Sequence, residues 1–206
     1  MVPICGKPMV ERVVNSIIAS GINDFIFVVS PDDEYIVNYF KGKTDLNSKV
    51  QFVYQQERKG MAHALQLAVP LINEDFVLCA CDNLVHEDDI KSMVDLWNKT
   101  KDSNVLLTLM EMPIEKISKS SAVCFSGGWV TKIIEKPKPE EAPSNIASIA
   151  LYVFTRGFLN YLPQIKPSPR GEYELQDAIQ MEIEHHGRVR GIQIADRKTV
   201  TTAADL

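Results

Sequence analysis

The chain has no long hydrophobic run, no excess of positive charge and no signal peptide, and each absence excludes a class of protein. No apolar stretch in its 206 residues approaches the ~20 residues that a membrane span needs. The N-terminus lacks the charged and apolar regions of a secretion signal. The formal net charge is -5 and the lysines are scattered, so the sequence offers nucleic acid no basic stripe. We therefore expect a cytoplasmic protein with neither membrane nor nucleic-acid partners.

Cysteine is also scarce, and its positions match neither a zinc site nor a disulfide framework. The four cysteines lie inside or beside apolar runs: Cys5, Cys79, Cys81 and Cys124. Free cysteine is among the most buried residue types. We therefore expect buried, reduced thiols.

The first half of the sequence alternates regularly between helical and extended patterns. Apolar spacing predicts helices at 8–20, 34–40, 61–69 and 88–99, and short apolar runs predict strands at 25–29, 50–54, 76–81 and 105–110. Because helices and strands alternate, the predicted fold is α/β. We expect a Rossmann-like sheet, mixed but mostly parallel, with flanking helices and right-handed crossovers.

The pattern changes after residue 110. Segments 121–125 and 129–134, joined through a Ser-Gly-Gly turn, predict a β-hairpin, and 147–154 predicts a further strand. The proline-rich segment 136–144 has strands close on both sides, so we interpret it as a surface loop rather than a linker. The sequence thus predicts one continuous domain over residues 1–206.

One predicted strand ends on a carboxylate. The run from Phe76 to Cys81 is typical of a buried strand, and Asp82 and Asn83 follow it directly. Ligands of open α/β sheets gather at the carboxyl ends of the strands. An acid at this place favours a cation or a phosphate-bearing substrate.

Two other segments have both a functional and a structural interpretation. Gly60-Met61-Ala62-His63-Ala64 begins a helix, where small residues either let backbone N–H groups approach a nucleobase or phosphate or serve packing alone. Glu135-Lys136-Pro137 ends a strand with charges that suit a phosphorylated sugar or are simply solvated. His63 has no orienting acid or nucleophile near it in the sequence, so we do not interpret it as a general base.

Taken in order, six segments resemble one family, the sugar-phosphate nucleotidylyltransferases. These enzymes, also called nucleoside-diphosphate-sugar pyrophosphorylases, include the glucose-1-phosphate thymidylyl- and uridylyltransferases. The resembling segments are Gly6-Lys7-Pro8-Met9, Gln55 with Gly60 and Ala62, Asp82-Asn83, Glu135-Lys136-Pro137, Ser144-Asn145 with Tyr152, and Pro167 to Asp177. The resemblance covers essentially the whole chain.

The resemblance implies an enzyme that transfers a nucleotidyl group from a nucleoside triphosphate to a sugar 1-phosphate, giving a nucleoside-diphosphate sugar and pyrophosphate. It also implies that residues 1–110 form a nucleotide-binding half and residues 111–206 a sugar-binding half. By resemblance, Gln55, Gly60 and Asp82 bind the nucleotide. Asp82 is in addition the implied catalytic ligand of Mg²⁺, which is the implied cofactor.

On the sugar side, the resemblance implies that Lys136 is catalytic and contacts the sugar phosphate. Glu135 and Tyr152 are implied to share in binding that substrate. Phosphoryl-type transfer depends mainly on positioning and on neutralising charge, which explains why a metal-holding carboxylate and a lysine are wanted together.

The sequence departs from the family pattern at two places. Family members open with a strand and a glycine-rich, arginine-containing loop upstream of the segment that 1–4 resembles, so we expect the first strand of the sheet to be missing and its two neighbours to lack a partner. Thr199 stands where the family has a second metal-binding aspartate, and Asp196 lies three residues away.

These departures leave two functional hypotheses open. The chain is either a nucleotidyltransferase represented without its N-terminal segment, or a non-catalytic relative that binds nucleotide or sugar phosphate or acts as a regulatory subunit. Strands with an unpaired edge also leave a homo-oligomer open.

Overall fold

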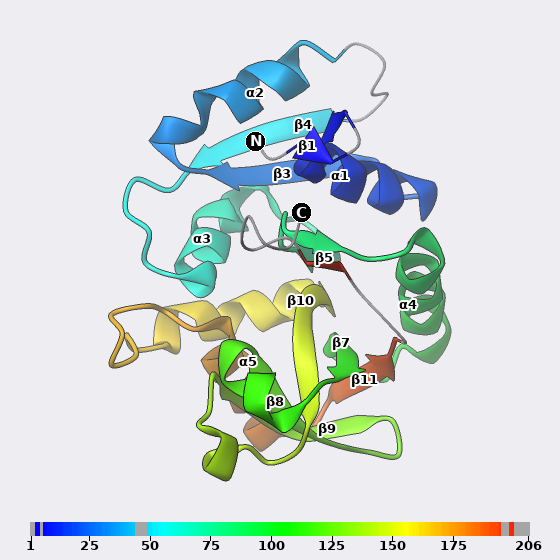
Figure 1. Ribbon diagram of the computed structural model, residues 1–206, viewed down its shortest axis with the longest axis vertical. Coiled ribbons are helices and arrows are strands. Elements are labelled where there is room, and N and C mark those ends of the chain that lie inside the picture. Colours follow the sequence, from blue (N-terminus) through cyan, green and yellow to red (C-terminus); the bar gives the residue numbers. More distant parts are fainter. Residues whose placement is uncertain (1–2, 5, 44–48, 195–197, 200–206) are drawn as a thin grey trace.

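The computed structural model describes residues 3–4, 6–43, 49–194 and 198–199, which form helices around β-sheets (Figure 1). The α-helices are α1 (Met9–Ala19), α2 (Glu34–Lys41), α3 (Met61–Ala68), α4 (Glu87–Thr100) and α5 (Leu175–His186). A long 3₁₀ segment, η5 (Arg156–Gln164), precedes α5. None of the helices in the described ranges is long and apolar enough to cross a bilayer.

The strands are β1 (Pro3–Ile4), β2 (Lys7–Pro8), β3 (Asp24–Val29), β4 (Lys49–Tyr54), β5 (Phe76–Cys79), β6 (Asn83–Leu84), β7 (Val105–Glu111), β8 (Ser121–Ser126), β9 (Trp129–Glu135), β10 (Ile146–Phe154), β11 (Val189–Gln193) and β12 (Lys198–Thr199). The strands that the sequence predicts begin and end close to their expected positions, and the structure adds β1, β2, β6, β11 and β12. The predicted hairpin is confirmed as β8 and β9, which pair antiparallel.

The main sheet has six strands in the order β5-β10-β7-β11-β9-β8. The expected mixed α/β class is confirmed: β5, β7 and β11 run in one direction, and β9 and β10 run against them. Of the described pairings, β3–β4 and β7–β11 are parallel, whereas β10 runs antiparallel to each of its partners β5, β7 and β8. The reversal comes at the hairpin turn between β8 and β9, and β10 keeps the direction of β9, since β9 and β10 both run antiparallel to β8.

The helices pack on both faces of this sheet and make it the middle of three layers. Along β7, Val105 and Leu107 join one hydrophobic cluster, which includes α3, η5 and α5. Leu106 points the other way, into a second cluster with α1 and α4. The alternation follows from the two-residue repeat of a strand, and both faces are apolar because both are covered.

The sheet is interrupted between β3 and β5. In the described part of the chain, β3 pairs only with β4, and β5 pairs only with β10. Yet β3 and β5 occupy the same layers: Ile26 and Leu78 pack on the first cluster, while Phe25 and Val77 pack on the second. Within the described residues, β3 and β5 each lack a partner on one side, as expected for the two neighbours of a missing strand.

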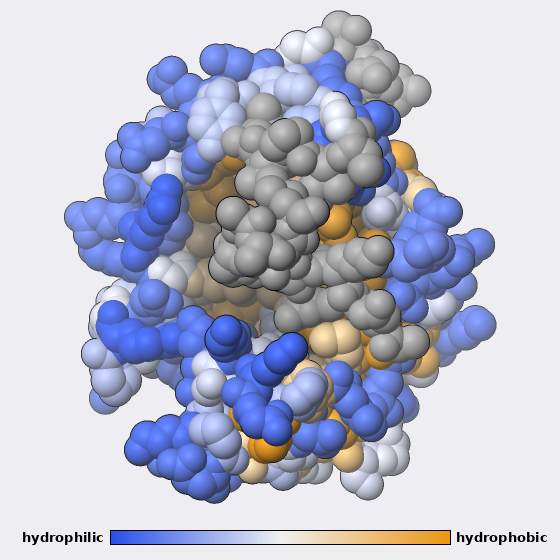
Figure 2. All heavy atoms as spheres, in the orientation of Figure 1, coloured by the Kyte–Doolittle hydropathy of each residue, from blue (hydrophilic) through white to orange (hydrophobic). Residues whose placement is uncertain are grey.

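This interruption explains why β5 is less buried than a central strand. All four of its residues are only partly buried, where the sequence predicts full burial. Figure 2 shows a hollow at mid-height between the upper and lower parts of the molecule, with hydrophobic residues on its walls. A strand that has neighbours on one side alone leaves part of its apolar surface open.

Candidate functional site

The turn after β5 holds Asp82 at the edge of the main sheet. The backbone N–H of Ala80 donates to the carbonyl oxygen of Ala150 at 2.9 Å, and the side-chain amide of Asn83 donates to the same oxygen at 3.1 Å. Asp82 lies between these two anchors and is partly exposed. The turn therefore presents a carboxylate to solvent from a fixed position on β10.

The end of β9 presents Glu135 and Lys136. The Ser121 hydroxyl donates to Oε2 of Glu135 at 2.5 Å, which fixes the carboxylate of a side chain that is 16% exposed. Lys136 follows with φ at 42°, a conformation that costs free energy for a residue with a side chain, and its N–H donates to Ser120 O at 3.0 Å. Its side chain is 42% exposed, and Nζ lies 3.8 Å from Oε1 of Glu135.

Strand β10 connects these two places. Ala150 holds the Asp82 turn, and Ser148, two residues earlier on β10, is the register partner of Ser121. Two residues of a strand span about 7 Å. Because Ser121 in turn holds Glu135, the structure brings the ends of β5 and β9 to one region of the sheet.

The segment from Gln55 to Gly60 lies at the ends of β3 and β4. The N–H of Gln55 donates to Val29 O at 2.8 Å, and its side-chain amide donates to Gly60 O at 3.2 Å. Gly60 has φ at 94°, and a Cβ there would lie 2.6 Å from the carbonyl oxygen of Tyr173. Only glycine fits so close to another backbone in this conformation.

The ends of β3 and β5 also lie close together. Cys81 is exposed as a residue, but atoms around its sulfur exclude part of the water, and this desolvation, the Asp82 carboxylate and, more weakly, the Asp33 carboxylate that follows β3 raise the pKa of its thiol. The carboxylates that follow the two strands thus both act on one thiol, in agreement with the packing of β3 and β5 in the same layers. Gln55 and Asp82 therefore belong to one end of the molecule, as the expectation for ligand sites of open sheets requires.

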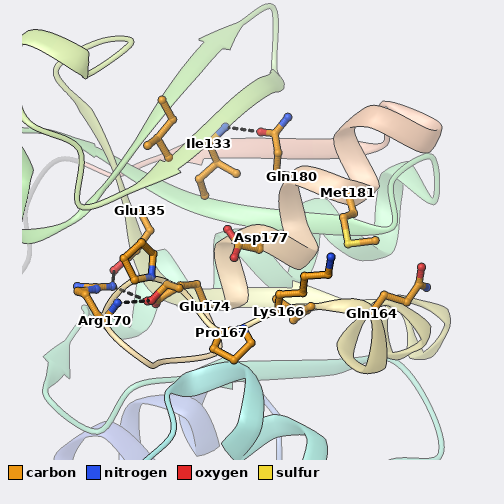
Figure 3. A pocket seen from close by; sticks show the side chains of 14 residues that line it. Ile133, Glu135, Gln164, Lys166, Pro167, Arg170, Glu174, Asp177, Gln180 and Met181 are labelled. Carbon is orange, nitrogen blue, oxygen red and sulfur yellow. Dashed lines mark hydrogen bonds and ion pairs between the residues drawn. The ribbon is translucent and has the colours of Figure 1, made fainter.

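The loop before α5 joins the two sides of this region. Arg170 donates to Oε1 of Glu174 at 2.7 Å and lies 3.6 Å from Oε1 of Glu135 (Figure 3). Next to Glu174, the N–H of Tyr173 donates to Lys59 O at 2.8 Å. A continuous set of contacts thus runs from the glycine segment through this loop to Glu135.

A cavity of about 640 Å³ lies beside Glu135, between β9, α5 and the segment 164–170. Figure 3 shows Glu135, Arg170, Glu174 and Asp177 near one another along its wall, with Lys166 farther along. Burial and the nearby carboxylates of Glu174 and Glu135 raise the pKa of Asp177. No sequence pattern predicts the contact of Arg170 with Glu135, because the two residues are far apart in the chain and meet only in the folded protein.

Tyr152 does not lie with the other predicted site residues. It is 1% exposed, and its ring packs edge-on against Phe154 inside the first hydrophobic cluster. Its hydroxyl accepts a hydrogen bond from Ser148 at 3.1 Å. Both faces of β10 are covered, so Tyr152 faces the core and supports the strand that connects Asp82 to Glu135. The role of Tyr152 in binding sugar phosphate stays a prediction.

The segment with Thr199 does reach the Asp82 turn. Strand β12 pairs antiparallel with β6, with Thr199 opposite Asn83, so the backbone of Thr199 lies across from the neighbour of Asp82. Asp196 lies outside the described residues. Within the described ranges no three His, Cys, Asp or Glu side chains gather in a way that could hold a metal ion.

The cysteines beside the site differ from one another. All three in the described part of the chain are free thiols, as expected, but none is fully buried: Cys79 and Cys124 are partly buried, and Cys81 is exposed. Cys79 is partly buried, and burial, helped by Cys81 and Asp82, raises the pKa of its thiol to about 12. Cys5 lies outside the described residues. The expected burial fails at Cys81 because β5 ends two residues before it, and the turn leads into solvent.

A family profile described as nucleotidyl transferase matches residues 1–196. The chain belongs to this family. This chain is 32% identical to the UTP-glucose-1-phosphate uridylyltransferase of Staphylococcus epidermidis, in an alignment that covers 87% of this chain and 72% of that protein. The resemblance that the sequence motifs indicate is thereby confirmed at the level of the family.

Other similar proteins differ in length. The bifunctional protein GlmU of Methanococcus maripaludis is 31% identical over 94% of this chain, but the chain spans only 44% of that protein. Among solved structures, a UDP-glucose pyrophosphorylase complexed with UDP-glucose superposes with a TM-score of 0.89 at 23% identity, covering 100% of this chain and 86% of that one. This structural similarity establishes the fold.

Proposed function

We propose that the protein transfers a nucleotidyl group from a nucleoside triphosphate to a sugar 1-phosphate. An oxygen of the sugar phosphate attacks the α-phosphorus, the bond from that phosphorus to the bridging oxygen breaks, and pyrophosphate leaves. The observation that carries this proposal is the joining of the Asp82 turn and the Glu135-Lys136 strand end through β10. A metal-binding carboxylate and a phosphate-binding cation at one sheet edge suit the charge that develops in this reaction.

Asp82 is the residue we assign to magnesium. Mg²⁺ usually keeps several waters and binds one or two carboxylates together with substrate phosphates, so a single partly exposed carboxylate fits an ion that arrives with the triphosphate. When bound, the ion would supply a positive charge that polarises the phosphate oxygens. Thr199, opposite Asn83, offers a hydroxyl-bearing residue type at the place of a second carboxylate.

The remaining roles follow from position and charge. Lys136, with its exposed ammonium, is assigned to the sugar phosphate, and Glu135, whose carboxylate Ser121 holds, to sugar hydroxyls. Gln55 and Gly60 are assigned to the base, because both lie at the ends of β3 and β4 beside a partly exposed surface. The names of the relatives make UTP and glucose 1-phosphate the first pair of substrates to test.

The test is a pyrophosphate-release assay with UTP, glucose 1-phosphate and Mg²⁺, on wild type, Asp82→Asn and Asp88→Asn. Losing the carboxylate at Asp82 should lower the rate about 100-fold or more, since metal stabilisation of the transition state is worth several kcal/mol. Asp88 is an exposed acid in the first turn of α4, and its replacement controls for the loss of one negative charge. Equal rates for wild type and D82N would contradict the assignment.

A second candidate is a protein that binds nucleotide or sugar phosphate without turnover. It is favoured by the residue type at Thr199 and by the interruption between β3 and β5. Calorimetric titration with UTP and magnesium, run beside the release assay, separates the two functions. Heat of binding without pyrophosphate release supports the second candidate, and turnover excludes it.

A further inference from the structure

The side chain of Gln55 is held in one orientation by its surroundings. An amide has one oxygen that accepts hydrogen bonds and one NH₂ group that donates two, and the neighbours decide which end points where. The carbonyl oxygen of Gly60, 3.2 Å away, can only accept. The nitrogen of the Gln55 amide must therefore face Gly60.

His63 takes the second proton of that nitrogen. Its Nδ1 lies 2.9 Å from Nε2 of Gln55. Because Nε2 can only donate, Nδ1 must accept, and the neutral imidazole then carries its own proton on Nε2. Both donors of the Gln55 amide are thus used within the protein.

The acceptor oxygen of Gln55 is left over. No described residue donates a hydrogen bond to it, and Gln55 is partly exposed. The frame around it is rigid, since the N–H of Ala62 donates to Tyr173 O at 3.1 Å and the N–H of Tyr173 donates to Lys59 O at 2.8 Å. The ring of His63 also lies 6.2 Å from the ring of Tyr173.

We propose that His63 is a positioning residue which fixes the Gln55 amide so that its oxygen selects a base carrying an N–H on the edge it reads, as uracil and thymine do. This inference rests on the proposed function of Gln55 as a base contact. The N3–H of uracil can donate to that oxygen, whereas N3 of cytosine is an acceptor and would leave two lone pairs opposed. Sites built around a specific hydrogen bond reject ligands that cannot make it.

Two variants of nearly equal size isolate the acceptor. His63→Asn keeps an oxygen close to the position of Nδ1, while His63→Leu removes the acceptor. Both lose the ring that lies beside Tyr173. A purely structural role of the ring would therefore affect the two variants alike.

The experiment measures binding of uridine 5′-monophosphate and cytidine 5′-monophosphate to the wild type and both variants by calorimetry. Wild type should bind the uridine nucleotide at least about tenfold more tightly. In H63L, affinity for it should fall about fivefold, the equivalent of one neutral hydrogen bond, while cytidine binding stays the same, so the selectivity narrows. H63N should restore most of the selectivity, and ¹⁵N spectra of wild type should show His63 protonated on Nε2 alone.

The possible failures are distinguishable. If wild type binds neither nucleotide, the proposed function of this segment fails, and this inference with it. If wild type prefers uridine but H63L keeps that preference, or if H63L and H63N lose affinity for both nucleotides equally, the base contact stands and the positioning role of His63 is refuted. A His63 proton on Nδ1 would refute it as well.

Discussion

Replacing Gly60 by alanine should destabilise the protein and do so through the backbone of a distant segment. A Cβ at Gly60 would lie 2.6 Å from the carbonyl oxygen and 2.9 Å from the nitrogen of Tyr173. Neither atom can move freely, because Tyr173 O accepts from the N–H of Ala62 and Tyr173 N donates to Lys59 O. The methyl group must push these strands of chain apart.

The magnitude can be worked from these contacts. Gly60 has φ at 94° and ψ at 174°, a region that is essentially restricted to glycine and costs other residues about 1–3 kcal/mol. Two disturbed backbone hydrogen bonds add about 1 kcal/mol each. We therefore expect Gly60→Ala to lower the free energy of unfolding by about 3–5 kcal/mol.

Gly21→Ala is the matched control. Gly21 follows α1 with the same φ of 94°, and a Cβ there would meet nothing within 4 Å. Gly21→Ala should therefore lower the free energy of unfolding only by the cost of holding alanine at a positive φ, about 1–2 kcal/mol. Urea unfolding of both variants gives the comparison, with an unchanged slope as the sign that stability alone has changed. If G60A were as stable as G21A, the close approach of Gly60 to Tyr173 would not exist in solution.

Three further predictions concern the stability and chemistry of the same fold. Burial alone would raise the pKa of Glu11, but hydrogen bonds from Lys43 and Tyr39 outweigh burial and lower that pKa below its usual value of 4.5. The stability that ionised Glu11 contributes is therefore present above pH 4.5 and is lost as the pH falls through the lowered pKa. Lys43→Met should therefore cost about 2 kcal/mol in urea unfolding at neutral pH, and the deficit should shrink in acid; a deficit independent of pH would contradict the pairing. Iodoacetamide at pH 8 should modify the exposed Cys81 at least about tenfold faster than Cys79, whose pKa is about 12, as peptide mapping would show; equal rates would contradict this. Lys136→Gly should raise the free energy of unfolding by about 1 kcal/mol, because glycine adopts the positive φ without strain, and should weaken binding of glucose 1-phosphate. A variant that is less stable than wild type as well as weaker in binding would show that the backbone at Lys136 is not strained.

Local pattern was enough to predict most elements and the place of Asp82. Apolar spacing and the turn residues determine where α1, α4 and the hairpin of β8 and β9 begin and end, and those signals lie within a few residues of one another. The carboxyl end of β5 followed from the same reasoning. What these signals do not contain is the direction in which a strand pairs, and so the antiparallel setting of β10 could not be predicted from its own sequence.

The site was predictable only in part for a similar reason. Tyr152 lies on a strand whose two faces are both apolar, so no alternation distinguishes a core tyrosine from one that reaches a ligand. The contact of Arg170 with Glu135 and that of Gln55 with His63 depend on loops whose geometry is set by the whole fold. Gly60, between Gln55 and His63, is the one feature of the sequence that points to their contact, because its positive φ turns the chain back toward Gln55.

Because the sheet is interrupted, contacts of the loop before α5 connect the β3–β4 side of the site with the main sheet, which neighbouring strands would do in a continuous sheet. Gln55 and Gly60 belong to the β3–β4 side, and Asp82 and Glu135 to the main sheet, and no strand described here pairs with both sides. The described contacts that connect the segment from Gln55 to Gly60 with Glu135 are those of Lys59 with Tyr173 and of Arg170 with Glu135. A substrate that spans both sides must therefore be aligned in part by this loop. It follows that Gly60→Ala should weaken binding of a uridine nucleotide as well as the fold, whereas Gly21→Ala should leave binding unchanged.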